Sequence, residues 1–279
     1  MPFTELLNTL MPPAERMRWE ACLARHAQDY ARNSDLVREG AVPEKMHIVL
    51  AGWAQRYKQL EDGRRQILGF VLPGEVCNLD LFTLMRADHS IAAVRTLTVA
   101  EIDRDEVERL LLDCPHLAQI LCLGEIIAKS RQHEWILSLG QRVAIERVAH
   151  LLCEIFERER LRGRVRGQRC DFPPTQAQIA EAVGLTPVHV NRMLHELRRG
   201  QRVEIANRRL FVPDFDALAQ VATFDARYLH GGEAEQLPAR ASALFDKDAP
   251  AGVRPPPLGA PPSSSYRRRP HPPSQAQAR

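Results

Sequence analysis

The sequence of 279 residues lacks the cysteine spacing of a metal ribbon or a disulfide scaffold. Six cysteines are scattered along it with no C-x-x-C pair, which argues against zinc ribbons, disulfide frameworks and thioredoxin motifs. No apolar run approaches the roughly 18 residues that span a membrane. Residues 1–16 also lack the basic start and apolar stretch of a signal peptide. These absences predict a cytoplasmic protein with reduced, mostly buried thiols and no membrane partner.

The motifs of common enzyme active sites are absent as well. The sequence contains no P-loop, no HExxH, no G-x-S-x-G and no paired acids in the context of a cleft. His133 and His195 precede acidic residues, but neither has a second ligand at metal spacing. We therefore predict no enzyme, no catalytic residues, no metal site and no resident cofactor. Regulation by a small-molecule or redox effector remains an alternative.

Positive charge is concentrated in the C-terminal half. Residues 1–140 carry 16 basic and 20 acidic side chains, whereas residues 141–214 carry 14 basic and 9 acidic ones. Residues 226–279 carry 8 basic and 4 acidic side chains. An excess of Lys and Arg in one region is what a phosphate-binding surface requires, although a solvated basic face has the same composition.

The stretch TQAQIAEAVGLTPVHVNRMLHELRR, residues 175–199, predicts two short helices. Thr175 and Gln178 form a capping box at the first helix start. Gly184 suits the left-handed residue that ends a helix, and Thr186 caps the second helix. An apolar stripe at i, i+3, i+4 and i+7 must then face the core: Val190, Met193, Leu194 and Leu197. This pattern is typical of a helix-turn-helix, although an ordinary helical hairpin has similar caps.

Upstream of this stretch the chain changes from helix to strand and back. Residues 1–30 are predicted to be helical, and residues 34–103 contain short β-type runs broken by turns. Asp62-Gly63 between two alternating runs indicates a hairpin. Several short strands at regular spacing indicate a small β-barrel or jelly roll.

Residues 116–139 predict a helix of about 24 residues, longer than a small domain needs. Such a helix favours pairing with a second copy along an apolar seam, and a buried core helix is the alternative. Its apolar edge consists of Ile120, Leu121, Gly124, Ile127 and Ala128, followed by Trp135 or Ile136.

Four further segments follow the long helix. Residues 141–160 predict an amphipathic helix, and residues 162–169 form a basic linker. Residues 200–214 read as a two-stranded wing that turns near Ala206-Asn207. Residues 226–279 contain 10 of the 20 prolines and are predicted to be disordered.

The order of β-barrel, long helix and winged helix-turn-helix resembles the Crp/Fnr family of bacterial transcription regulators. The resemblance covers roughly residues 20–222. Its most specific letters are LPGEVCNLDLF (72–82), LGQRVAIERVAHLL (139–152) and IAEAVGLTPVHVNRMLHELRR (179–199). The resemblance implies an α+β chain with a jelly-roll sensor domain (1–112), a dimerisation helix (113–140), a winged helix-turn-helix (141–222) and a disordered tail (226–279).

The resemblance implies a homodimer that reads a pseudo-palindromic site in double-stranded DNA through helix 186–199 and contacts RNA polymerase. Half-sites would lie about 34 Å apart, one turn of DNA. Arg192 matches a family Arg that pairs with guanine or phosphate, whereas Pro187 and Val188 replace the family's polar pair. The predicted DNA-binding residues are Thr175, Thr186, Val188, His189, Asn191, Arg192, His195, Arg199 and Arg208.

The β-domain of this family binds cyclic nucleotides through a cassette that opens with Gly-Glu and closes with Arg-Ser or Arg-Thr. Here His89 replaces the phosphate-binding Arg, and an imidazole beside Asp88 is a poor clamp for an anion. Cyclic AMP is therefore disfavoured. Cys77 is read as a buried thiol, with a redox switch as the alternative. The candidate effector residues are Gly74, Glu75, Cys77, His89 and Ser90.

Two alternatives concern oxygen sensing by an iron–sulfur cluster and binding of a protein partner. Oxygen-sensing members bind a [4Fe–4S] cluster through closely spaced N-terminal cysteines, but only Cys22 precedes the barrel here, so that mechanism is excluded. The alternative function is a ligand-sensing module whose winged domain binds a protein. Exposed arginines count against it, because docking helices favour apolar anchors: Arg192, Arg198, Arg199, Arg208 and Arg209.

Overall fold

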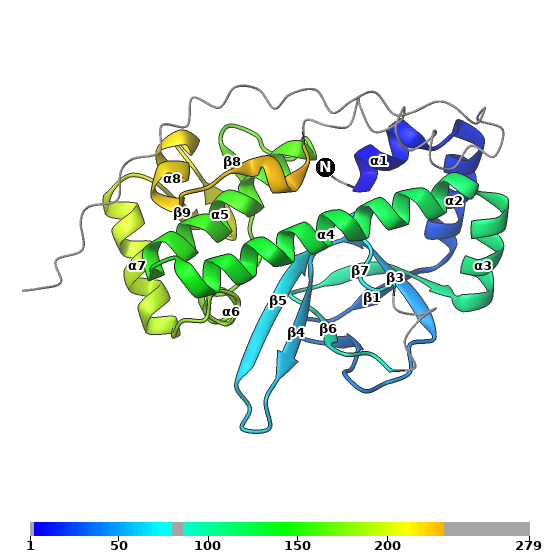
Figure 1. Cartoon of the computed structure of the whole chain (residues 1–279), viewed down its shortest axis with the longest axis horizontal. Helices are drawn as coiled ribbons and strands as arrows, with labels where there is room; N and C mark the ends of the chain where they lie inside the picture. Colours follow the sequence, from blue (N-terminus) through cyan, green and yellow to red (C-terminus); the bar gives the residue numbers. More distant parts are fainter. Residues whose placement is uncertain (1–2, 80–85, 232–279) are drawn as a thin grey trace, which may run out of the picture. The chain divides into compact units, whose positions relative to one another are not determined.

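The N-terminal part of the chain combines two short helices with antiparallel strands (Figure 1). The computed structural model describes residues 3–79 and 86–231. Within them the helices are α1 (Phe3–Leu10) and α2 (Pro13–Arg25). The strands are β1 (Ala27–Tyr30), β2 (Asp35–Val37), β3 (Lys45–Ala51), β4 (Ala54–Gln59), β5 (Arg65–Val71), β6 (Ser90–Ala93) and β7 (Leu97–Asp103).

These strands form two antiparallel sheets that pack on each other. One sheet has the order β1-β7-β3 and the other the order β2-β6-β4-β5. Val49 and Val99 from the first sheet share a buried apolar cluster with Val71 and Ile91 from the second. The predicted β-rich N-terminal fold is therefore confirmed, and so is the hairpin at Gly63, whose φ of +87° lies in the left-handed region.

Residues 27–30 correct the sequence prediction, which placed them in the N-terminal helical region. They form β1, which pairs antiparallel with β7 from Ala27 opposite Ala100 to Tyr30 opposite Leu97. The letters AQDY show no apolar alternation. Backbone pairing with a distant strand, rather than local preference, makes this segment a strand.

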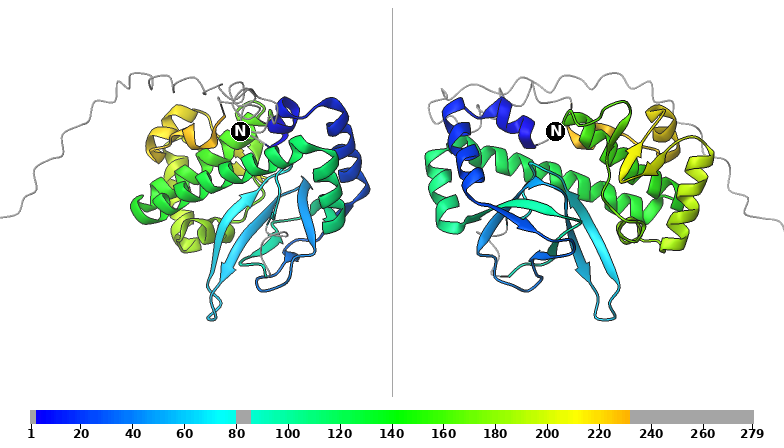
Figure 2. Two further views of the ribbon diagram at one scale, coloured as in Figure 1. Left: turned by 45° about the vertical axis from the view of Figure 1, so that its right-hand side comes forward. Right: turned by 180° about the vertical axis from the view of Figure 1, so that it is seen from behind.

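Three helices then carry the chain from the β-domain to the C-terminal part: α3 (Arg104–Asp113), α4 (Pro115–Gln141) and α5 (Ala144–Leu161). The 27 residues of α4 span about 40 Å at 1.5 Å per residue. Figures 1 and 2 show α1, α2 and α3 near one end of α4 and the helix-turn-helix near the other. The predicted long helix and the helix after it are both confirmed.

The apolar edge predicted for α4 faces the chain's own β-domain. Ile120, Leu121 and Ile127 are at most 7% exposed and belong to one cluster with residues of α1, β3 and β7. Ile120, Leu121 and Ile127 of this edge are therefore core residues, as the alternative predicted, whereas Ile136 is 68% exposed. A different face of α4 is exposed, and its members include Cys122, Ile126, Lys129, His133, Ile136 and Leu137.

The C-terminal part is a helix-turn-helix with a small sheet. Its elements are β8 (Arg169–Asp171), α6 (Gln176–Val183), α7 (Pro187–Arg199), β9 (Glu204–Ala206), β10 (Arg209–Phe211), α8 (Phe215–Ala222) and the 3-10 helix η2 (Ala226–Leu229). The sheet has the order β8-β10-β9. The wing turns one residue later than predicted, at Asn207 and Arg208, which both have positive φ, as a two-residue hairpin turn requires. Neither β8 nor α8 was predicted.

The predicted disordered tail begins too early at residue 226. Leu229 of η2 is 2% exposed, and the Tyr228 hydroxyl donates a hydrogen bond of 3.0 Å to Glu154 of α5. The Tyr228 ring also stacks on His150 at a centroid distance of 6.0 Å. Residues 232–279, including the arginines 267–269, lie outside the described residues.

In the described part of the chain, no single helix is long and apolar enough to cross a membrane. Taken together, α3 and α4 satisfy the same criterion of length and composition, but their axes are bent by 113° at the junction.

Candidate nucleic-acid interface and sensor pocket

Local hydrogen bonds build the helix-turn-helix as its letters predict. The Thr175 hydroxyl accepts from the backbone N–H of Gln178 at 3.2 Å, and the Gln178 side chain accepts from the N–H of Thr175 at 2.9 Å. Gly184 ends α6 with a φ of +65°, where any side chain would be strained. The Thr186 hydroxyl then caps α7 by accepting from the N–H of His189 at 3.2 Å. The two helices are thus fixed mainly by their own sequence.

Helix α7 buries one face and exposes the other. Val190, Met193, Leu194 and Leu197 are all at most 7% exposed, as predicted, and pack in the core that α7 shares with α5 and α6. On the opposite side, Val188 is 82% exposed, and Arg192, His195 and Arg199 are also exposed. These four positions follow at intervals of three and four, so they form one solvent-facing stripe.

Several predicted DNA-binding side chains also bond to one another. Arg192 Nη2 lies 3.0 Å from His189 Nε2, and because a guanidinium can only donate, this ring nitrogen is the acceptor. Asn191 donates to the Gln176 side chain of α6 at 3.1 Å. The hydroxyls of Thr175 and Thr186 act as helix caps. Beside them the first backbone N–H groups of α6 and α7 favour an anion.

The wing adds a basic tip to this surface. Arg208 lies in the turn between β9 and β10 and is exposed. Arg209 follows it and forms an exposed ion pair of 3.4 Å with Asp171 of β8. Arg208 is thus an exposed cation at the wing tip, whereas Arg209 is paired with Asp171.

Helix α6 lies between α7 and the β-domain. Arg65 of β5 forms an ion pair of 3.0 Å with Glu181, and Gln66 donates to the carbonyl of Ala182 at 3.2 Å. Gln178 also donates to Gln55 of β4 at 3.2 Å, in buried surroundings. These contacts attach the helix-turn-helix to the sensor domain through α6 and leave the outer face of α7 in solvent.

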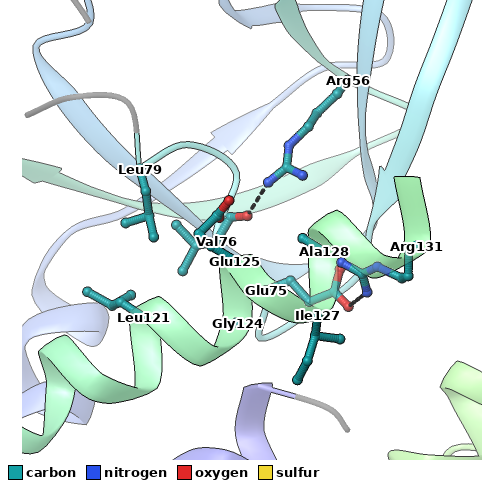
Figure 3. A pocket seen from close by; sticks show the side chains of 10 residues that line it. All are labelled: Arg56, Glu75, Val76, Leu79, Leu121, Gly124, Glu125, Ile127, Ala128 and Arg131. Atoms are coloured by element: carbon teal, nitrogen blue, oxygen red, sulfur yellow. Dashed lines mark hydrogen bonds and ion pairs between the residues drawn. The ribbon is translucent and has the colours of Figure 1, made fainter. Parts of the chain in front are cut away.

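Glu75, a predicted effector residue, is engaged by the chain itself. Its carboxylate accepts from Arg131 of α4 at 2.8 Å (Figure 3). It also accepts from Arg158 of α5 at 2.7 Å. Burial works against its charge, but Arg131 and Arg158 outweigh burial and hold the pKa of Glu75 well below its usual range. The backbone N–H of Leu72 also donates to it at 3.0 Å. Glu75 thus joins the β-domain to both helices.

The cavity beside Glu75 and Arg131 has a volume of about 30 Å³, close to that of one water molecule. A larger cavity of about 310 Å³ lies nearby. It is lined by Arg56, Cys77, Asn78, Leu79, Asp88, His89, Glu125 and Gln132. Of the predicted effector residues, the structure brings Cys77 and His89 together at this larger cavity and places Glu75 at the smaller one.

The two remaining effector candidates have internal roles. Gly74 has a φ of +86°, and its N–H donates to the carbonyl of Val49 at 2.6 Å. The hydroxyl of Ser90 accepts from the N–H of Glu39 at 2.9 Å and is buried. Both residues shape turns of the β-domain, and neither lines the larger cavity.

The chemistry of the larger cavity differs from that of an anion site. Arg56, which the sequence reasoning missed, donates to the carbonyls of Val76 and Cys77 at 2.9 Å each. His89 is hydrogen-bonded to Asp88, and this bond lowers the pKa of Asp88. Burial raises the pKa of Cys77 to about 12, so its thiol is protonated at neutral pH. Carboxylates thus border the cavity, and Arg56, the arginine among the lining residues that the structure describes, bonds to the backbone.

Two family models match the chain, and one is described as the cyclic nucleotide-binding domain (residues 27–114). The other is the Crp-like helix-turn-helix domain (residues 146–221). The transcriptional activatory protein AadR of Rhodopseudomonas palustris is 32% identical over 214 residues, which are 74% of this chain and 86% of AadR. The chain belongs to the Crp/Fnr family.

Other members show the same relationship. The transcriptional activator protein FnrL of Cereibacter sphaeroides is 27% identical over 72% of this chain and 82% of its own length. The solved structure of FixK2 from Bradyrhizobium japonicum covers 72% of this chain and 98% of FixK2, with a TM-score of 0.63 and 24% identity. The FixK2 structure therefore supports the Crp/Fnr fold.

Membership confirms the family resemblance and the α+β fold. The chain is a DNA-binding transcription regulator of the Crp/Fnr type. Crp/Fnr regulators bind DNA and typically act as dimers, and the relatives named above are regulators rather than enzymes.

Proposed function

We propose that this Crp/Fnr regulator binds a pseudo-palindromic operator as a homodimer, with α7 of each protomer in a major groove. The exposed stripe of α7 carries the proposal, because its opposite face is buried and cannot reach DNA. Arg192 supplies a donor for guanine, and Val188 supplies an apolar contact for the methyl group of thymine. His189 supports Arg192 through their hydrogen bond.

Phosphate contacts come from the edges of this surface. Arg208 at the wing tip and Arg199 at the end of α7 are exposed cations. The starts of α6 and α7, capped by Thr175 and Thr186, present backbone N–H groups to phosphate oxygens. Such contacts fix the position of the protein on DNA, while α7 reads the sequence.

Dimerisation uses the exposed face of α4 rather than its buried edge. Cys122, Ile126, Lys129, His133 and Ile136 follow one another at spacings of four, three, four and three, which is the repeat of a two-stranded coiled coil. Two-fold symmetry then relates the two copies of α7. It requires two half-sites about 34 Å apart.

The signal at the β-domain is not cyclic AMP in this proposal. Asp88 and Glu125 border the 310 Å³ cavity, and its lining arginine already bonds to two carbonyls, so a cyclic phosphate meets repulsion there. A [4Fe–4S] oxygen sensor is also not proposed, because one cysteine, Cys22, precedes β1. We expect the regulator to act in the cytoplasm, to contact RNA polymerase there and to catalyse no reaction.

Selection of bound sites from a random DNA pool tests this function. Run with and without cell extract, it yields the operator and shows whether an added signal is required. Arg192→Ala is then expected to lose about 1–3 kcal/mol of discrimination at one base pair of each half-site, measured by fluorescence anisotropy.

The matched variant Arg208→Ala has a different expected signature. It should weaken binding to all sequences alike and reduce the salt dependence by about one phosphate contact. Equal affinity for selected and scrambled sites would contradict the proposal. A stable protein complex without DNA affinity would instead support a protein-binding role for the winged domain.

A further inference from the structure

Three metal-binding side chains converge where α2 ends. They are Cys22, His26 and Glu106, and their ligand atoms all lie within 4.8 Å of one another. Cys22 lies in the last turn of α2, and His26 is the C-cap residue that follows the helix, four positions later. Glu106 extends from the first turn of α3. This third ligand is 84 residues from Cys22, which is why local spacing in the sequence did not reveal the group.

The distances suit a metal ion that is coordinated tetrahedrally. Cys22 Sγ lies 3.5 Å from Glu106 Oε1, and His26 Nε2 lies 2.7 Å from Glu106 Oε2. Around a tetrahedral Zn²⁺, neighbouring ligand atoms are about 3.4–3.6 Å apart. The sulfur and Oε1 already have this separation, whereas the imidazole lies against the other oxygen, Oε2, so the carboxylate or the imidazole must shift for one ion to bind all three side chains.

The surrounding elements hold these side chains in place. The carbonyl of His26 accepts from the N–H of Glu101 in β7 at 2.9 Å, which fixes the backbone where α2 passes into β1. Cys22 is fully buried, whereas the side chains of His26 and Glu106 are 27% and 21% exposed. An ion can therefore enter from solvent on one side and meet the thiol at the base of the site.

The charges also fit a divalent cation. A thiolate and a carboxylate together neutralise one divalent ion, while the imidazole binds as a neutral ligand. Without such an ion, Arg25 provides the compensating charge through a 2.9 Å ion pair with Glu106. Its side chain is 67% exposed, so it can turn away into water at little cost.

We propose that Cys22, His26 and Glu106 form a binding site for a thiophilic divalent transition metal, with Zn²⁺ as its representative. Binding transfers the thiol proton of Cys22 to solvent and forms a metal–sulfur bond. Three protein ligands leave a fourth position for water or another small donor, so the ion is exchangeable rather than sealed in. The bound ion links α2 to α3.

This link has a consequence for regulation that rests on the proposed function. Helix α3 leads directly into α4, whose exposed face we assign to dimerisation. An ion that fixes α2 on α3 therefore stabilises the N-terminal end of α4. We expect added Zn²⁺ to change the affinity of the protein for its operator. This change is measured separately from metal binding.

Titration of the reduced full-length protein with Zn²⁺, by calorimetry, tests the site. One ion per chain is expected, and Co²⁺ in its place should give a thiolate-to-cobalt charge-transfer band. Cys22→Ser and His26→Ala should each weaken binding about tenfold or more, because each removes a direct ligand. The control variant Cys114→Ser, which alters another buried thiol, should bind like the unmodified protein.

The variant Arg25→Ala distinguishes a metal site from a cluster of ion pairs. Removal of the competing guanidinium should tighten Zn²⁺ binding several-fold, and this variant retains all three ligands. No binding at one ion per chain, or unchanged binding by Cys22→Ser with native circular dichroism, would overturn the proposal. Because calorimetry requires no DNA, failure of the metal site and failure of operator binding are distinguished.

Discussion

The carboxylate of Glu75 lies between two buried guanidinium groups, and this placement predicts a strong effect on stability. Replacement by Gln leaves Arg131 and Arg158 without their shared anion. Removing one partner of a buried ion pair costs about 3–5 kcal/mol. We expect Glu75→Gln to lower the free energy of unfolding by about this amount in urea denaturation. The exposed residue Glu125 of α4 provides the control, since Glu125→Gln should change it by about 0.5 kcal/mol or less.

The stabilisation by Glu75 is also expected to depend on pH. Folding lowers the pKa of Glu75, so the unfolded chain binds its proton at a higher pH than the folded one. The stabilisation is then fully present above the ordinary carboxyl pKa of about 4.3 and is lost as the pH falls below it. Urea denaturation between about pH 5 and pH 3 should show a steeper loss for the unmodified protein than for Glu75→Gln. Parallel pH profiles would contradict this role.

Glu75 also shows how much of a single residue's role can be predicted from the sequence. The letters around Gly74 and Glu75 indicate the family cassette correctly. What the carboxylate binds depends on Arg131 and Arg158, which are 56 and 83 residues away. No local pattern contains that information, so the sequence does not predict this internal ion pair.

Among the elements, the helix-turn-helix was predictable because its signals are local. Its capping box, its left-handed Gly184 and its apolar stripe each lie within a few residues of the bonds that they determine. Helix α4 is different, because apolar side chains occur on more than one of its faces. Periodicity predicts a long helix but does not say which face covers the β-domain and which meets a partner.

The exposed face of α4 predicts that two charged substitutions will separate the dimer. Ile126 and Ile136 are 53% and 68% exposed, so replacing both by Asp should leave the protomer folded. In the paired helices, however, the new carboxylates would be buried without partners. Sedimentation should change from dimer to monomer, with operator affinity lost in parallel. Leu112→Asp alters a residue of α3 that is 82% exposed and should remain dimeric; dissociation of both variants would count against the assignment to α4.

Over the whole described unit, the sensor domain and the DNA-binding domain share one core. Trp53 and Phe70 of the β-domain belong to the same buried cluster as Phe156 and Phe172 of the C-terminal part. The family resemblance implied a separate β-domain and a separate winged helix-turn-helix. The contacts that join them lie between segments distant in sequence, such as Gln55 and Gln178, which are 123 residues apart. A shared core implies that the two parts unfold together.

The ion pair between β5 and α6 allows this coupling to be measured. Glu181→Arg places a second guanidinium opposite Arg65, whereas the exchange Arg65→Glu with Glu181→Arg restores opposite charges. A double-mutant cycle in urea should give a coupling energy of about 0.5–1 kcal/mol, because both side chains are partly exposed. Ala177→Arg, at an exposed position of α6, is the control and should not couple to Arg65→Glu. Zero coupling, or two separate unfolding transitions in the unmodified protein, would show that the helix-turn-helix is not stabilised by its contact with the sensor domain.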